Sequence, residues 1–361
     1  MNKIAHIQSL RGVLAMFIVL FHSPIDSLIT GAFLINAWIA VDIFFVISGY
    51  VITLNYLDIS SSDQIKSFQK RRFWRIYPLH FATLIFFLLL EITKYFLIYF
   101  SSYLDYMTPF EVNDLSSFIS NLFLLQVLTG HAISWNIVSW SISAEFWTYM
   151  IFAFAAFISA QNIHRYLYIS IILIIISAII LSMYGFHPVN GLSRAVYSFF
   201  IGSIFLVLFE SKFKNVNSLI TPALIIGLLF IGIFSNGENS AGINFLIPFF
   251  AAPVLILLNG TSHTNVLKKF LNLPALVYLG KISFSIYLLH NIIWLALKLF
   301  LTQVLNFPLL LNSHEQLRVL IESQILSNVL ILFSLSILIF LSHLSYKYIE
   351  KPFIKVSNFR K

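Results

Sequence analysis

Residues 37–52 read AWIAVDIFFVISGYVI, an apolar run that is broken by one carboxylate, Asp42. Similar runs recur along the 361 residues, of which 59% are hydrophobic and only 10% are charged. A soluble domain carries roughly 25% charged residues, because water must cover its surface. The composition therefore excludes a soluble or disordered chain and predicts an all-α integral membrane protein.

At roughly 20 residues per span, this length admits about ten transmembrane helices with short connections. The stretch 118–128 is apolar but too short to cross a bilayer, so we expect an interfacial or re-entrant piece there. The predicted spans are 7–24, 31–53, 79–100, 138–160, 166–185, 194–209, 217–235, 241–258, 273–301 and 319–345.

The charges of the connections predict the orientation in the membrane. Acidic residues such as Asp105, Glu111, Asp114 and Glu238 fall in one set of connections, and most basic residues fall in the other. By the positive-inside rule, the basic set and both termini face the cytoplasm. The net charge of +8 is explained in this way, and we expect no nucleic-acid partner. The basic set contains Lys66, Lys70, Arg71, Arg72, Arg75, Arg165, Lys212, Lys214, Lys268, Lys269 and the tail 347–361.

The chain contains no cysteine. This absence excludes disulfides, thiolate metal sites and a cysteine acyl-enzyme. We expect no bound metal. With no repeat and no low-complexity linker, residues 1–361 are predicted to form a single membrane-embedded domain.

Arg11 and His22 lie in the first predicted span, eleven residues apart. Eleven residues make close to three helical turns, so both side chains fall on one stripe, roughly 16 Å apart along the axis. A cation near the cytoplasmic end and a deeper imidazole suit a long anionic ligand. The alternative is that Arg11 extends to the lipid headgroups and His22 makes a helix-packing hydrogen bond.

Asp42 is expected at a depth similar to that of His22. A carboxylate beside an imidazole can orient it and raise its basicity. The alternative is a buried ion pair with Arg11 or another cation, which would serve assembly rather than chemistry. Gly49 and Ser48 are interpreted as helix-packing residues.

The segment KRRFWRIYP (70–78) is expected to be a loop between the second and third spans. Arg72 and Arg75 stand three residues apart, and a guanidinium group can bind phosphate oxygens with two parallel hydrogen bonds. The alternative is ordinary positive-inside charge with interfacial aromatic residues.

The segment WSISAEFWTY (140–149) opens the fourth predicted span. Ser141, Glu145 and Tyr149 recur every four residues and share one helix face. Trp140 and Trp147 flank that face. A carboxylate among indoles resembles a carbohydrate-binding arrangement, so these residues are candidates for an acceptor site. An interfacial tryptophan belt is the alternative.

The ninth predicted span contains GKISFSIYLLH (280–290). Ser283, Tyr287 and His290 lie along one stripe of this helix. For Tyr287 and His290 we consider contact with the acceptor substrate or a structural hydrogen bond between helices, and Ser283 fits the structural role better.

In this order along the chain, the segments resemble the acyltransferase-3 family of membrane O-acyltransferases, which includes bacterial polysaccharide O-acetyltransferases and Nod-factor-modifying enzymes. The resemblance runs from about residue 4 to residue 353 and implies ten helices without an appended periplasmic domain. Its segments are SLRGVLAMFIVLFHS, AVDIFFVISGYVIT, KRRFWRIYPLH, WSISAEFWTY, GKISFSIYLLH and YIEKPF.

The resemblance also implies roles for residues. His22, paired with Arg11, would be catalytic, and Arg72 and Arg75 would hold the phosphates of acyl-CoA, with acetyl-CoA the expected donor. The acceptor would be a hydroxyl of a cell-surface or lipid-linked glycan, modified at the inner membrane of a bacterium. Direct transfer is favoured over an acyl-enzyme, and a transporter of a small anion is the alternative function.

Overall fold

The computed structural model describes residues 5–30, 36–101, 108–209, 225, 227–228, 242–260, 266–311 and 317–358. Most of these residues are helical, and their only sheet is a short two-stranded hairpin. The chain divides into a first unit, Met1–Asn55 with Ser198–Tyr346, and a second unit, Tyr56–Tyr197 with Lys347–Lys361. The single domain expected from the sequence stays a prediction.

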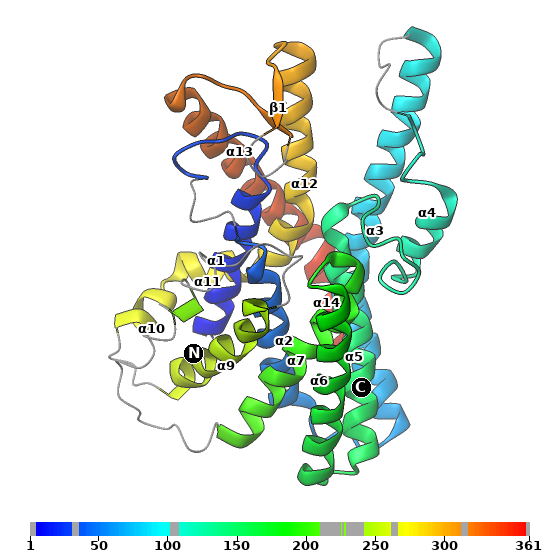
Figure 1. Ribbon diagram of the computed structural model, residues 1–361, viewed down its shortest axis with the longest axis vertical. Coiled ribbons are helices and arrows are strands. Elements are labelled where there is room, and N and C mark those ends of the chain that lie inside the picture. The colour runs from blue at the N-terminus through cyan, green and yellow to red at the C-terminus, as the bar shows by residue number, and fades with distance from the viewer. Residues whose placement is uncertain are drawn as a thin grey trace. The chain divides into compact units, whose positions relative to one another are not determined.

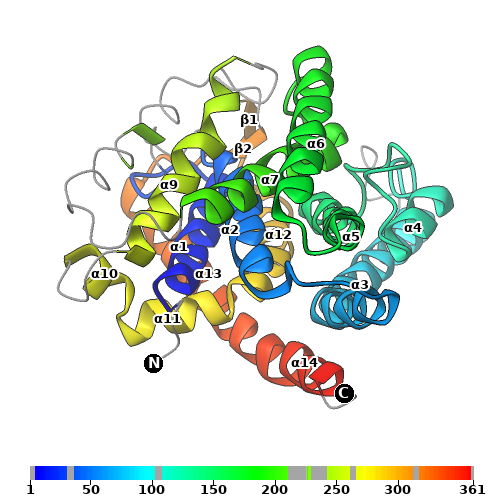
Figure 2. The same cartoon turned by 90° about the horizontal axis from the view of Figure 1, so that it is seen from below.

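The first unit is built around α1, which packs against α11 and α12, while α12 also packs against α13 (Figures 1 and 2). A buried apolar cluster that includes Ala15, Val19, Ile286 and Ile331 joins three of these helices. The elements of this unit are α1 (Ala5–Phe21), α2 (Ile39–Tyr56), α7 (Gly191–Phe209, from Ser198 onward), α9 (Ile247–Gly260), α10 (Val266–Leu271), α11 (Pro274–Lys281), α12 (Ser283–Leu299), β1 (Leu309–Leu311), β2 (Leu317–Val319) and α13 (Gln324–Ser345).

The second unit is a bundle in which α5 packs against α3 and α6, and α14 packs against α3 (Figure 2). Its short helix α4 begins after Asp114, whose carboxylate accepts a 2.7 Å hydrogen bond from the backbone N–H of Ser117. That hydrogen bond lowers the pKa of Asp114. The helices of this unit are α3 (Ser62–Ser101), α4 (Leu115–Leu122), α5 (Trp140–Ser159), α6 (Ile163–Tyr184) and α14 (Lys351–Asn358).

Eight helices of the described residues are long and apolar enough to cross a membrane, and α1 adds a shorter apolar helix of 17 residues. Helix α4 has eight residues and cannot span, in line with the expectation for 118–128. The predicted span 217–235 lies outside the described residues, apart from Ile225, Gly227 and Leu228. The prediction of an all-α integral membrane protein is confirmed.

The helix faces have the polarity expected in lipid. On α6, Ser170 and Ser177 are buried, whereas Ile172, Ile175 and Ile179 are exposed. Lipid tails are as apolar as isoleucine, so small polar residues that allow close packing and hydrogen bonding occupy the interior face instead. On α13, Ser327, Ser334 and Ser342 are buried in the same way.

The loop predicted at 70–78 is wrong, because these residues lie inside α3, which is 40 residues long. Pro78 removes only one helical hydrogen bond. Phe73 stacks on Tyr77 one turn further along the helix, and Trp74 stacks on Phe353 of α14. Tertiary packing therefore overrides the tendency of a proline to end a helix.

Two glycine contacts set the closest helix crossings of the first unit. A Cβ atom on Gly280 would lie 1.9 Å from the carbonyl oxygen of Gln8, where α11 meets α1. A Cβ atom on Gly49 would lie 1.9 Å from the carbonyl oxygen of Phe199, where α2 meets α7. The expected packing role of Gly49 is confirmed.

We predict that Gly280→Ala lowers the free energy of unfolding by about 2 kcal/mol or more, because the backbones of α1 and α11 must separate to admit the methyl group. Gly242→Ala is the matched control, since a Cβ atom there would meet nothing within 4 Å. Thermal unfolding in detergent measures both variants. Equal melting temperatures for the two would contradict the close crossing.

Candidate active site

His22 directly follows the last residue of α1, and its side chain is exposed. Its Nδ1 lies 2.9 Å from the carbonyl oxygen of Ile18, one helical turn back. A carbonyl can only accept, so Nδ1 carries the proton and Nε2 keeps its lone pair. The geometry therefore presents His22 as an oriented base.

His290 on α12 lies beside His22, with ring centroids 5.1 Å apart. It is fully buried, and the ring of Tyr287 packs against it at 5.8 Å. Within the described part of the chain, neither ring nitrogen of His290 has a hydrogen bond of normal geometry. Two residues from separate predicted spans thus meet as one pair of imidazoles.

The end of α1 is held by residues that the sequence analysis did not select. Trp294 Nε1 donates a 2.7 Å hydrogen bond to the carbonyl of Val19, and Arg318 Nη2 donates one of 3.3 Å to the carbonyl of Phe21. The backbone N–H of Val319 bonds the carbonyl of Pro24 at 2.8 Å. The sequence does indicate Trp294, because it lies four residues beyond His290 and so shares the same helix face.

Among the described contacts of this turn, Arg318 is the residue that brings a positive charge. Its Nε lies 3.9 Å from a carboxylate oxygen of Asp26. Burial lowers the pKa of Arg318, and the charge of Asp26 partly opposes that shift. A guanidinium group stays charged through such shifts, so Arg318 supplies a fixed positive charge beside the turn that carries His22.

Arg11 and Asp42 also belong to the first unit. Arg11 is half-buried on α1, and its Nε has no hydrogen-bond partner among the described residues. Asp42 is fully buried in the first turn of α2. Its predicted role of orienting His22 stays a prediction, and in the structure the carbonyl of Ile18 accepts the Nδ1 proton that such a carboxylate would take.

Arg72 lies in an aromatic cage in the second unit. Its guanidinium carbon is 5.2 Å from the ring centroid of Tyr56, 5.6 Å from that of Phe68 and 5.8 Å from that of Tyr149. Nη2 donates a 3.1 Å hydrogen bond to the hydroxyl of Tyr56, while Nε has no partner in the described residues. Arg75, one turn further along α3, is exposed.

The predicted acceptor residues of α5 divide into two groups. The hydroxyl of Tyr149 donates a hydrogen bond to Glu145, so these two residues join the cage of Arg72. Trp140 is buried, and the guanidinium of Arg194 lies over one face of its ring at 5.0 Å. Ser141 is buried and donates to the carbonyl of Val138.

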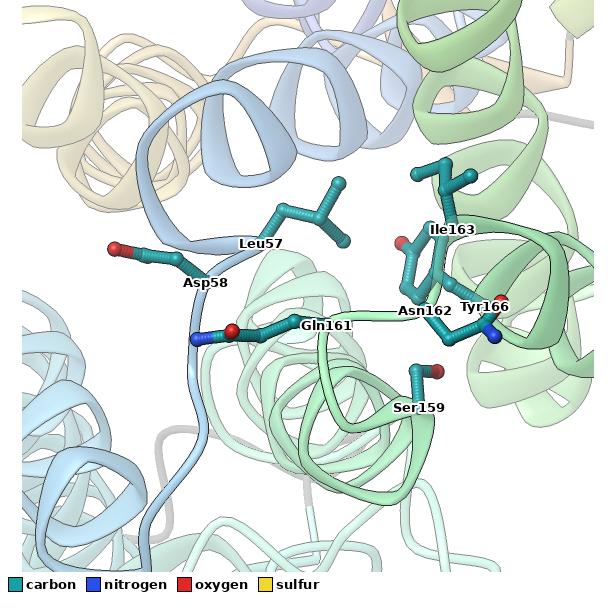
Figure 3. Close-up of a pocket in the computed structure, with 7 residues that line it drawn as sticks. All are labelled: Leu57, Asp58, Ser159, Gln161, Asn162, Ile163 and Tyr166. Carbon is teal, nitrogen blue, oxygen red and sulfur yellow. The ribbon is translucent and has the colours of Figure 1, made fainter.

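A cavity of about 410 Å³ lies beside the cage, within the second unit. Leu57 immediately follows Tyr56 and faces Ile163 and Tyr166 of α6 across the cavity (Figure 3). The α5–α6 turn supplies the amide side chains of Gln161 and Asn162. The other lining residues are Asp58 and Ser159.

The helices define a membrane protein. The oriented imidazole of His22 gives this protein a polar site at the end of α1. A family model described as an acyltransferase domain, that of the acyltransferase-3 family, matches residues 4–345. The chain belongs to this family and is a membrane acyltransferase. No curated protein and no solved structure gave a match. The segment YIEKPF lies beyond the matched residues.

We predict that Trp294→Phe lowers the free energy of unfolding by about 1–3 kcal/mol, because the carbonyl of Val19 loses its buried partner. Trp74→Phe is the matched control, since Trp74 makes ring contacts and has no hydrogen bond in the described residues. Thermal unfolding of both variants in detergent measures the difference. A larger loss in the Trp74 variant would refute the anchoring role of Trp294.

Proposed function

We propose that this protein transfers a short acyl group, acetyl by preference, from acyl-CoA to a hydroxyl of a cell-surface or lipid-linked glycan. The reaction would take place in the inner membrane of a bacterium, with the donor supplied from the cytoplasm. The observation that carries the proposal is His22, whose Nδ1 bond to Ile18 leaves Nε2 as a base, in a chain of the acyltransferase-3 family.

We propose direct transfer. The acceptor hydroxyl gives its proton to Nε2 of His22 as its oxygen bonds to the thioester carbonyl carbon. The carbon–sulfur bond then breaks, and the departing thiolate takes the proton from His22 to give free CoA. His22 acts first as a base and then as an acid, and it ends the cycle neutral. Tyr287 and His290 would complete the surroundings of His22.

For the donor, we propose that Arg72 and Arg75 bind the phosphates. Both lie in the basic segment of α3, which the positive-inside rule assigns to the cytoplasmic side. The aromatic cage packs against the guanidinium of Arg72, whose Nε has no hydrogen-bond partner among the described residues. Charge-assisted hydrogen bonds from a guanidinium to a phosphate are worth roughly twice a neutral one.

We predict that His22→Ala lowers acyl transfer by 10²-fold or more, the usual range for loss of a positioned general base, and leaves the Kd for acetyl-CoA within about twofold. Release of free CoA by purified protein in nanodiscs measures transfer, and equilibrium binding measures Kd. Retained turnover would disprove the role of His22. No release by the wild-type protein, even with mixed surface glycans, would favour the transporter.

We predict that Arg72→Ala raises the Kd for acetyl-CoA about tenfold, because a charge-assisted hydrogen bond to phosphate is lost. Lys66→Ala is the matched control. It removes the same charge from the same helix, but Lys66 is exposed, and its one ion pair among the described residues is with Asp63 at 3.6 Å. Equal effects of the two variants would mean that Arg72 contributes only general positive charge.

A further inference from the structure

The cavity of the second unit has the size and lining of a small-molecule site. Its volume of about 410 Å³ falls within the range of roughly 300–1,000 Å³ that ligand pockets occupy. Leu57, Ile163 and Tyr166 give it apolar walls, and Gln161 adds an amide group at its edge (Figure 3). The side-chain oxygen of Asn162 instead caps α6, where it accepts a 3.1 Å hydrogen bond from the backbone N–H of Arg165. Apolar walls with an amide group at the edge fit a planar heterocycle that is recognised by its edge.

The turn that carries this amide has a strained backbone. Ala160 and Gln161 have φ values of 48° and 62°, so two successive residues other than glycine occupy the left-handed region. Such conformations cost about 1 kcal/mol or more each and persist where the surrounding structure imposes them. The turn runs from the left-handed C-cap of α5 at Ala160 to the start of α6, and Gln161 within it lines the cavity.

The cavity is connected to the basic segment of α3 through Tyr56, which borders the cavity wall in sequence and contacts two arginines of that segment. Leu57 of the cavity wall is the neighbour in sequence of Tyr56, and the guanidinium groups of Arg71 and Arg72 lie 5.5 Å and 5.2 Å from the ring of Tyr56. A chain of ring contacts, from Phe68 to Phe152 at 6.0 Å and from Phe152 to Tyr166 at 6.2 Å, links the cage to the cavity floor. Phosphates attached to a heterocycle in the cavity would extend toward Tyr56, the residue whose ring Arg71 and Arg72 contact.

We propose that this cavity binds the adenosine end of the acyl donor. The inference rests on the proposed function, because it takes the donor to be an acyl-CoA. The adenine of an acyl-CoA would fill the apolar cavity, and its phosphates would extend toward the guanidinium groups. An acyl group carried on the phosphopantetheine of a carrier protein has no nucleobase to fill the cavity. The site therefore selects a nucleotide-bearing donor.

Gln161→Gly gives a clean test, because glycine accepts the left-handed backbone without strain while the amide is removed. Ala160→Gly is the matched control. It relieves the same kind of strain at the neighbouring residue, which does not line the cavity. Both variants should unfold at or above the wild-type temperature, so a loss of binding in Gln161→Gly would not reflect misfolding.

The measurement uses full-length protein in nanodiscs with two donors, acetyl-CoA and S-acetyl-phosphopantetheine, and with adenosine 3′,5′-bisphosphate as a competitor. We expect Gln161→Gly to raise the KM for acetyl-CoA and the Ki of the bisphosphate three- to tenfold. A change of this size corresponds to the loss of one or two hydrogen bonds between the amide and the ligand. The KM for S-acetyl-phosphopantetheine should not change, and Ala160→Gly should change none of these values. Leu57→Trp, which fills the cavity, should abolish competition by the bisphosphate.

Equal use of both donors by the wild-type protein, without competition by the bisphosphate, would overturn the inference and leave the proposed acyl transfer standing. An equal rise in KM for both donors in Gln161→Gly would also overturn it. Absence of transfer from either donor in the wild-type protein would instead refute the proposed function itself.

Discussion

The carbonyl groups at the end of α1 control the arrangement of the histidine site. The last carbonyls of any helix lack partners within the helix, and a buried carbonyl without a donor costs free energy. Here the carbonyls of Val19 and Phe21 recruit Trp294 and Arg318, while that of Ile18 also accepts the Nδ1 proton of His22. One physical requirement therefore positions the imidazole, selects its tautomer and joins α1 to α12 and β2.

The same requirement explains where polar residues lie in the rest of the molecule. Buried serines follow the inner faces of α6 and α13, and isoleucine, leucine and phenylalanine cover their outer faces. Close backbone crossings at Gly49 and Gly280 bring neighbouring helices together without large apolar side chains between them. Association of these helices depends on packing and hydrogen bonding, because lipid already solvates apolar side chains well.

Much of the site could be chosen from residue type, since an ionisable side chain in an apolar run is costly and so invites a functional explanation. His22 and His290 were selected on that basis, and the structure places their rings 5.1 Å apart. Arg72 and Tyr149 were also selected, but for opposite ends of the reaction, and the structure joins them in one cage. Trp294 shares a helix face with His290, but nothing in the sequence indicates Arg318, because its partner is a backbone carbonyl that no side-chain pattern reveals.

The sequence by itself determined the all-helical membrane architecture, the order of the segments and the family. Hydropathy and the cost of intramembrane charge are properties of local composition, so they can be recognised without coordinates. Only the tertiary structure decided that 70–78 is helical, that Trp140 is covered by Arg194, and that the turn at Ala160 and Gln161 borders a cavity. Each of these depends on side chains or backbone groups that are distant in sequence or on packing that overrides local propensity.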